Sequence, residues 1–214
     1  LDAACGTGRR VSGPHATRHG RRASVSGSAD LPGRAVGVDL VHAMLAAGRR
    51  ARPDGPAVAC ADLRALPFAD RRFDVVWCRL ALGHLGTLGT AYRELGRVCR
   101  RGGCVVVSDF HPEAAKTGHT RTFRDARGRL REVEHFVHAA ADHRAAARAA
   151  GLTLDDRVDA SVGPEVRPIY ERAKALDRYR IHRGLPLVLA LRFSRPASGA
   201  DESPHLNAAG RAEG

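Results

Sequence analysis

Short apolar segments of strand type alternate with segments of helical periodicity along the first half of the chain. The strand-type runs are residues 35–40, 57–63, 73–82 and 104–110. Residues 41–51 and 90–103 lie between them and have helical spacing. Parallel strands need crossover connections, which are usually helices. The alternation therefore predicts an α/β fold whose sheet is doubly wound and mostly parallel.

The two helical runs each place apolar side chains on one face. These are Val41, Met44 and Leu45 in the first run, and Tyr92, Leu95 and Val98 in the second. We expect Gly102-Gly103 to stop the second helix. We also expect residues 57–63 and 104–110 to be buried strands, because both are short, nearly continuous apolar runs.

The second half of the chain has a different pattern. Residues 121–136 resemble two strands around the turn "DARG" and predict a hairpin. We then expect a helix over 138–151, a strand over 152–160, a helix over 167–184 and a final antiparallel strand over 186–193. We expect one domain over residues 1–195, with its core motifs in 1–112 and a hairpin and cap in 113–184. Residues 196–214 lack an apolar pattern and predict a disordered tail.

Arginine carries nearly all of the positive charge. Lys+Arg exceed Asp+Glu by 35 to 23, for a formal net charge of +12, yet Lys116 and Lys174 are the only lysines. The arginines are scattered, so we expect no specific nucleic-acid partner. No run approaches the ~20 apolar residues of a membrane span, and the five cysteines form no CxxC pair. With no signal peptide, this favours a cytoplasmic protein and no membrane partner.

Acidic residues and glycines follow the ends of the strand-type runs. Ligands of open parallel sheets bind beyond the carboxyl ends of the strands. Gly6 and Gly8 allow a tight turn and a close approach of backbone to ligand. Asp39 could accept both hydroxyls of a ribose, and Asp62 an adenine amine. Any single aspartate could instead cap a helix or turn.

Four motifs in the first half resemble those of class I S-adenosylmethionine-dependent methyltransferases. They are "LDAACGTG", "GVDL", "ADLRALPFADRRFDVVWC" and "YRELGRVCRRGGCVVVSDF", within Leu1 to about Pro112. The resemblance is closest to the small-molecule type that includes the ubiquinone-biosynthesis enzymes, and it implies a Rossmann-like fold. A nicotinamide or flavin site is disfavoured, because Val11 stands where G-x-G-x-x-G needs its third glycine.

The resemblance also implies a role for each matching residue in binding S-adenosylmethionine. The methionine moiety would be held by Asp2, Ala4, Cys5, Gly6 and Gly8. Asp39 would bind the ribose hydroxyls, and the adenine would lie near Leu40, Met44, Asp62 and Leu63. Cys78 and Arg79 would border the amino-acid end of the cofactor.

Methyl transfer needs a general base only where the acceptor is a hydroxyl or a protonated amine. We expect His84 and His111 as candidates, because both follow strand ends and histidine titrates near neutral pH. Either could instead be a hydrogen-bonded or surface histidine. The spacing of His135, His138 and His143 does not indicate a metal site. The hairpin and residues 164–184 would cover a small-molecule acceptor, and hairpin arginines could bind an acidic one or simply face solvent.

Two departures from the family pattern lead to further expectations. Only Leu1 precedes Asp2, so the first strand and the N-terminal helices would be largely missing and the chain truncated at its N-terminus. The 31 positions between Gly8 and Asp39 hold an atypical stretch, residues 9–33, which we expect to be a disordered insertion. We expect such a chain to bind S-adenosylmethionine weakly or not at all. The alternative function is an inactive remnant or partner-binding domain that keeps the fold.

Overall fold

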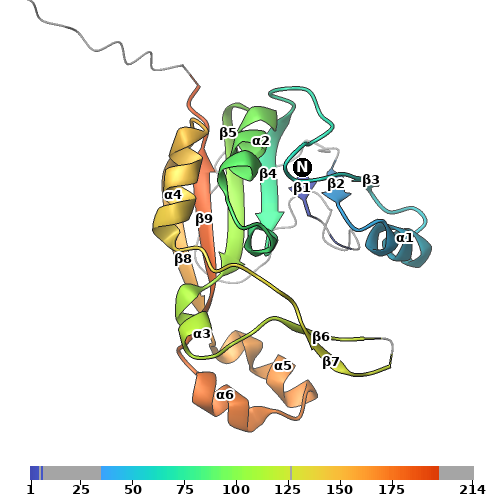
Figure 1. The fold of residues 1–214 in the computed structure, drawn as a ribbon, viewed down its shortest axis with the longest axis vertical. Helices are drawn as coiled ribbons and strands as arrows, with labels where there is room; N and C mark the ends of the chain where they lie inside the picture. The colour runs from blue at the N-terminus through green and yellow to red at the C-terminus, as the bar shows by residue number, and fades with distance from the viewer. Residues whose placement is uncertain (5, 7–34, 126, 198–214) are drawn as a thin grey trace, which may run out of the picture.

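A computed structural model describes residues 1–4, 6, 35–125 and 127–197, and its main feature is one seven-stranded sheet (Figure 1). The strand order is β3-β2-β1-β4-β5-β9-β8. The strands are β1 (Asp2–Ala3), β2 (Val36–Asp39), β3 (Ala57–Cys60), β4 (Phe73–Arg79), β5 (Cys99–Phe110), β8 (Thr153–Ser161) and β9 (Pro186–Ser194). Strands β1 to β5 are parallel to their neighbours in that group, and β9 runs antiparallel to β5 and β8. The predicted Rossmann-like α/β class with an antiparallel C-terminal strand is confirmed.

Strand β1 has two residues but lies in the middle of the sheet. Asp2 is in register with Gly37 of β2 on one side and with Trp77 of β4 on the other. The carbonyl oxygen of Leu1 also accepts a hydrogen bond of 2.8 Å from the backbone N–H of Trp77. Because both neighbours are in place, the carboxyl end of β1 opens at the centre of one sheet edge.

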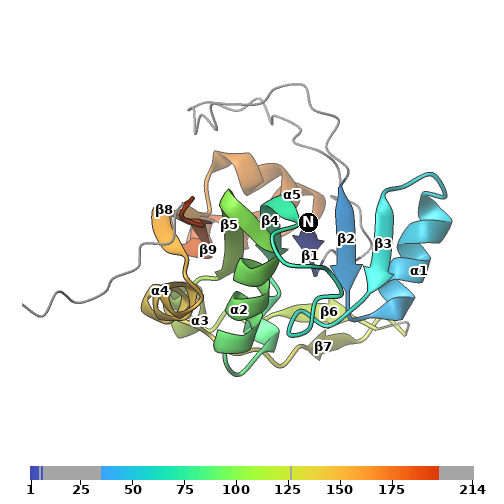
Figure 2. The same ribbon diagram turned by 90° about the horizontal axis from the view of Figure 1, so that it is seen from above.

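Helices α2 (Gly89–Val98) and α4 (Ala140–Ala149) lie side by side on one face of the sheet (Figure 2). The predicted apolar face of α2 is confirmed, because Tyr92, Leu95 and Val98 are fully buried. Tyr92 also packs edge-on against Phe193 of β9, with 5.6 Å between the ring centres. The core therefore lies between these two helices and strands β4, β5 and β9.

Helix α1 (His42–Ala51) lies at the other end of the sheet, against β2 and β3. Of its predicted apolar face, Leu45 is buried, whereas Val41 and Met44 remain 48% and 42% exposed. The predicted burial of residues 57–63 is wrong for β3 itself. Ala57, Ala59 and Cys60 are exposed, because β3 is the edge strand of the sheet.

Two predicted helix ends are also corrected. Helix α2 ends at Val98 and not at Gly102-Gly103, because Cys99 already pairs with Phe73 in the sheet. The expected single helix over 167–184 is two short helices, α5 (Arg167–Arg172) and α6 (Leu176–His182). Lys174 between them has a left-handed φ of 51°, which a continuous helix cannot contain.

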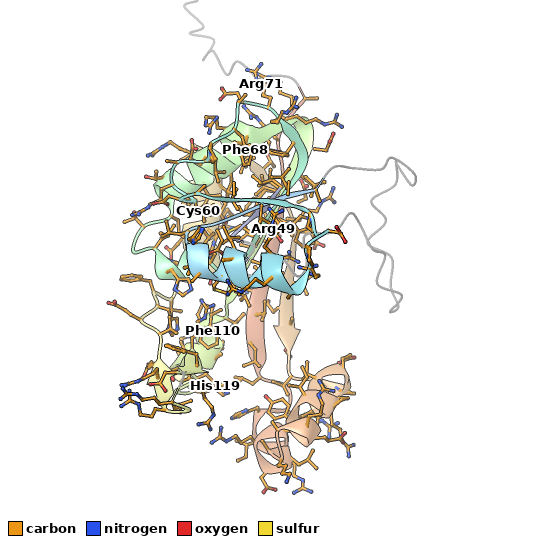
Figure 3. All side chains as sticks on the ribbon, turned by 90° about the vertical axis from the view of Figure 1, so that its right-hand side faces the viewer. Arg49, Cys60, Phe68, Arg71, Phe110 and His119 are labelled. Carbon is orange, nitrogen blue, oxygen red and sulfur yellow. The ribbon has the colours of Figure 1, made fainter. Side chains whose placement is uncertain are left out.

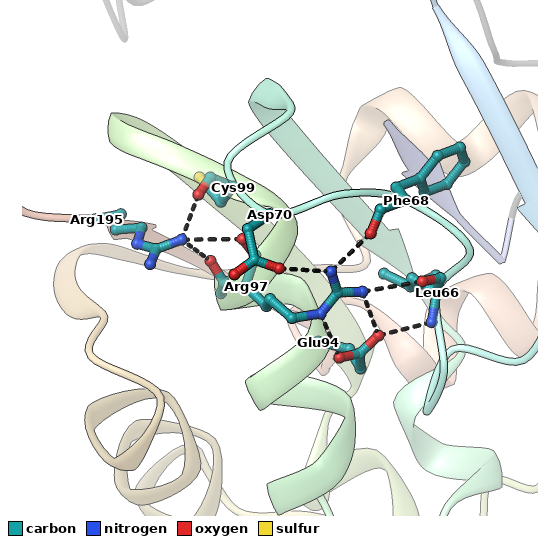
Figure 4. A network of polar contacts seen from close by, with 8 residues as sticks. Leu66, Phe68, Asp70, Glu94, Arg97, Cys99 and Arg195 are labelled. Atoms are coloured by element: carbon teal, nitrogen blue, oxygen red, sulfur yellow. Dashed lines mark hydrogen bonds and ion pairs between the residues drawn. The ribbon is translucent and has the colours of Figure 1, made fainter.

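The connection between β3 and β4 is held by the side chain of Arg97 (Figure 4). Its guanidinium donates to the carbonyl oxygens of Leu66 and Phe68 at 2.9 and 2.6 Å. It also pairs with Glu94 at 2.7 Å and with Asp70 at 2.9 Å. One cation on α2 thus satisfies four acceptors and fixes this loop on the sheet.

The hairpin and the short helices lie beyond the carboxyl ends of the parallel strands (Figure 1). The predicted hairpin is confirmed as β6 (Thr122–Arg124) paired with β7 (Leu130–Glu132), and α3 (Pro112–Lys116) leads into it. Phe110 and His119 lie toward this end of the molecule (Figure 3). The expected disordered insertion over 9–33 lies outside the described residues, as does nearly all of the expected tail. None of the described helices combines the length and apolar character needed to span a bilayer.

Candidate active site

A left-handed turn follows β1 and folds back onto the end of β2. Ala4 and Gly6 have φ of 64° and 59°, a region that costs residues other than glycine free energy. The backbone N–H of Gly6 donates to Asp39 Oδ2 at 2.7 Å. A Cβ at Gly6 would lie 3.4 Å from Met44 Cε, so the turn also packs against α1. Cys5 and Gly8, predicted for the same turn, lie outside the described residues.

Asp39 connects this turn to the first helix. Its Oδ1 accepts a hydrogen bond of 2.9 Å from the backbone N–H of Val41, next to the first residue of α1. Leu40 follows Asp39 in the chain and Met44 lies against the turn at Gly6, and they expose 63% and 42% of their surface. The predicted site residues of this region therefore lie together, with an acidic group beside an open apolar surface.

Asp2 and Arg79 form an ion pair across the ends of β1 and β4. Asp2 is 5% exposed, and its Oδ1 is buried with no hydrogen-bond partner among the described residues. Burial raises the pKa of Asp2, while the Arg79 guanidinium acts in the opposite direction. Arg79 also lies 5.7 Å from the ring centre of Trp77. The site thus presents one buried carboxylate oxygen that can accept a hydrogen bond from a ligand.

Three other predicted cofactor residues are placed differently. The Asp62 carboxylate forms an ion pair with Arg64, two positions further along the chain, at 2.7 Å. The side chain of Leu63 is in the hydrophobic core at 8% exposure, and that of Cys78 is fully buried. The side chains of Leu63 and Cys78 therefore belong to the core and are not open to a ligand.

His84 ends the 3-10 turn η1 (Leu82–His84), which follows β4. Its pKa is lowered, first by burial and then by the Arg121 guanidinium, so its imidazole is neutral at pH 7. The Nη1 atom of Arg121 is buried and finds no hydrogen-bond partner among the residues that the structure describes. A neutral imidazole and an unsatisfied cationic donor thus lie near each other beyond the end of β4.

His111 is engaged through both ring nitrogens. Its Nε2 lies 3.2 Å from Asp159 Oδ1, and its Nδ1 accepts from the backbone N–H of Glu113 at 3.1 Å. The second bond caps α3. His111 is therefore a helix cap in this structure, and neither nitrogen points to a free acceptor site.

Asp109 and His143 are two further buried residues near the site, and neither was predicted from the sequence as a site residue. Both are buried, at 2% and 0% exposure, and they face each other at 3.5 Å. One sequence signal was present: His143 is the bulkiest residue pointing inward from the alanine-rich helix α4. In the described part of the chain, no three His, Cys, Asp or Glu side chains are grouped to hold a metal ion.

The first half of the chain matches a family described as "Methyltransferase domain", over residues 1–107. The chain belongs to the class I S-adenosylmethionine-dependent methyltransferases. Over 109 residues it is 41% identical to a malonyl-[acyl-carrier protein] O-methyltransferase of Halorhodospira halophila, covering 49% of this chain and 34% of that protein. Over 78 residues it is 41% identical to a demethylmenaquinone methyltransferase of Renibacterium salmoninarum, covering 36% and 32%.

This methyltransferase chain therefore spans about a third of the length of these two curated relatives. A solved structure of an S-adenosylmethionine-dependent methyltransferase from Mesorhizobium loti has the same fold. The TM-score is 0.59 at 20% identity, covering 91% of this chain and 89% of that one. At 20% sequence identity this similarity supports a shared fold and nothing further.

The described residues of this methyltransferase fit its cofactor, S-adenosylmethionine. The Oδ1 atom of Asp2, which has no hydrogen-bond partner among the described residues, suits an ammonium group, and Gly6 adds no side chain of its own to the turn. Each Asp39 oxygen accepts a hydrogen bond from one backbone N–H and keeps acceptor capacity for a hydroxyl. Leu40 and Met44 offer apolar surface to a planar base.

Proposed function

We propose that this chain transfers the methyl group of S-adenosylmethionine to a small-molecule acceptor that binds beyond the carboxyl ends of β4 and β5. The observation that carries the proposal is the order of the strands. Because β1 and β4 are neighbours, the residues that fit the cofactor end beside the turn that carries His84. When bound, the cofactor supplies an electrophilic methyl group on a sulfonium.

His84 acts as the general base in this proposal. Its lowered pKa keeps a nitrogen lone pair free at neutral pH, so the imidazole can take the proton of an acceptor hydroxyl or enol. The backbone of Glu134 and the guanidinium of Arg121 face the same ring. The hairpin side of the site therefore orients the base.

Arg121 holds the negative charge that develops on the acceptor. Its buried Nη1 has no hydrogen-bond partner in the described part of the chain, and leaving a buried donor unsatisfied costs about 1–3 kcal/mol. An anionic oxygen of the acceptor would remove that cost. The name of one relative specifies a malonyl group on an acyl-carrier protein, and a malonyl group carries a carboxylate that Arg121 could bind; the name of the other specifies a demethylmenaquinone.

A methyl-labelling experiment tests this function. The 214-residue chain is incubated with S-adenosylmethionine labelled on its methyl group and with a protein-free small-molecule extract of cells. We expect the label in a low-molecular-weight product, with at least tenfold less product from His84→Ala. A chain that binds the cofactor but yields no labelled small molecule would contradict the proposal.

The acceptor class is tested with two defined compounds, a malonyl thioester and a demethylated naphthoquinol. The role of His84 as base predicts transfer to the naphthoquinol, whose hydroxyl must lose a proton. Transfer to the malonyl carboxylate that His84→Ala leaves unchanged would contradict that role, because an ionised carboxylate needs no base.

A further inference from the structure

Three buried polar side chains connect three elements of the core next to the proposed acceptor site. They are Tyr92 on α2, His143 on α4 and Asp109 near the end of β5. The Tyr92 hydroxyl is hydrogen-bonded to His143 Nδ1 at 3.0 Å. His143 Nε2 lies 3.5 Å from Asp109 Oδ2, and neither of these two atoms has a hydrogen-bond partner among the described residues. The exposure of the three residues is 0%, 0% and 2%. Polar groups this deep are costly unless they satisfy one another.

The protonation states of Tyr92 and His143 fix the direction of the hydrogen bond between them. Burial raises the pKa of Tyr92, so its hydroxyl stays protonated. Burial lowers the pKa of His143 to about 4, so its ring is neutral. The tautomer that accepts at Nδ1 from Tyr92 carries its proton on Nε2, on the side of the ring that faces Asp109. Burial also raises the pKa of Asp109.

The other oxygen of Asp109 faces the 3-10 turn that presents His84. Asp109 Oδ1 accepts a hydrogen bond of 2.8 Å from the backbone N–H of Phe110. A Cβ at Gly83 would lie 3.1 Å from that same oxygen and 3.1 Å from the Phe136 carbonyl oxygen. The Phe136 N–H in turn donates to the Gly83 carbonyl at 2.7 Å. Gly83 is thus enclosed between Asp109 and the chain that follows the hairpin.

We propose that Asp109, packed against His143 and Tyr92, is a positioning residue that fixes the turn Leu82–His84 and with it the imidazole of His84. Asp109 lies between this turn and the hydrogen-bonded Tyr92–His143 pair of the two core helices, so the turn cannot shift toward the core without displacing Asp109. The inference rests on the proposed function only in the use that the enzyme makes of His84. The arrangement of the turn itself is independent of activity.

The test reads the His84 ring directly. Its NMR signal, assigned with His84→Gln, is followed through a pH titration in the full chain. The charged groups around this ring are Arg121, His135 and Asp109. In Asp109→Asn the carboxylate charge is lost and the turn is freed. We expect His84 to bind its proton three- to tenfold more weakly, with unchanged affinity for S-adenosylhomocysteine.

Tyr92→Phe is the second variant, because it removes one hydroxyl and keeps the ring that packs on Phe193. We expect the midpoint of the His84 titration to move in the same direction as in Asp109→Asn, but by a smaller amount. Asp177→Asn changes an acid whose side chain is 91% exposed and is the matched control. A folded Asp109→Asn or Tyr92→Phe protein with a wild-type His84 titration overturns the inference.

Turnover separates this inference from the proposed function. We expect kcat to fall about tenfold in Asp109→Asn, with little change in the KM for the cofactor. If the His84 signal moves in Asp109→Asn but His84→Gln retains full turnover, the positioning is supported and the role of His84 as base fails.

Discussion

Asp39 Oδ2 accepts a hydrogen bond from the backbone N–H of Gly6 at 2.7 Å, which ties the turn after β1 to the end of β2. The two residues are 33 positions apart in the chain. Their contact brings the glycine turn, the carboxylate and the start of α1 to one edge of the sheet. Parallel neighbours in the sheet order make this possible, because β1 and β2 end at the same edge.

Asp39→Ala removes both backbone bonds of this carboxylate and its capacity to bind a ribose. Each lost hydrogen bond costs about 1 kcal/mol, so we expect at least tenfold weaker binding of S-adenosylhomocysteine in calorimetry. Asp54→Ala is the matched control, since Asp54 is an exposed acid beyond the other end of α1. Unchanged affinity in Asp39→Ala would remove Asp39 from the cofactor site.

His84→Ala should lower turnover more than cofactor affinity. General-base catalysis contributes at least ~100-fold in rate, so we expect a loss of that order in kcat with an unchanged dissociation constant. The pKa of His84 lies below its ordinary 6.5, and the base is the deprotonated form. Wild-type activity should therefore be full above pH 6.5 and fall as the pH drops through the lowered pKa. An equal loss of turnover and affinity would make His84 structural.

His143 makes stability depend on pH. Its pKa is lowered from 6.5 to about 4 in the folded state. Between these values the unfolded chain binds a proton that the folded chain does not, so the contribution is complete above pH 6.5 and is lost as the pH falls toward 4. This difference between the two pKa values corresponds to a contribution of about 3 kcal/mol to the free energy of unfolding.

Urea unfolding at several pH values measures this contribution. His143→Gln keeps a donor and an acceptor in the core but does not titrate, so its free energy of unfolding should fall less than that of the wild type between pH 6.5 and 4. Parallel curves for the two proteins would mean that His143 is accessible to protons in the folded state.

Arg97→Ala should destabilise the fold by about 2 kcal/mol, because it removes the donor to the carbonyl oxygens of Leu66 and Phe68 and the cationic partner of Glu94. Arg97→Lys should restore only part of the lost stability, since one ammonium group cannot make the several hydrogen bonds of the planar guanidinium. Arg93→Ala on the same helix loses one exposed bond to Thr90 and should stay within ~0.5 kcal/mol of wild type. Equal midpoints of Arg97→Ala and wild type in urea would contradict this role.

The fold was predictable from local patterns because buried strands and amphipathic helices have different periods. The face of α2 and the antiparallel β9 follow from those patterns. The exposure of β3 could not be predicted in this way, because an edge strand and a central strand can have the same short apolar sequence. The break at Lys174 also left no signal, since lysine is a good helix former.

The positions of Asp2 and Asp39 in the fold were predictable, because each lies at a strand that the local pattern indicates; their roles toward the cofactor stay predictions. The contacts between side chains that are far apart in the sequence could not be predicted. His111 was predicted as a base, but whether its nitrogens are free depends on Asp159, which is 48 positions away. The Tyr92–His143 contact spans 51 positions and depends on the docking of two helices.

The most direct test of the cofactor site is a titration of the 214-residue chain with S-adenosylhomocysteine, followed in amide ¹H–¹⁵N spectra, which also detect weak binding. We predict saturable shifts at the amides of Gly6, Leu40, Val41 and Met44, where the turn after β1 meets the start of α1. An absence of shifts at millimolar ligand, or saturable shifts confined to other parts of the chain, would contradict the placement of the cofactor at this edge of the sheet.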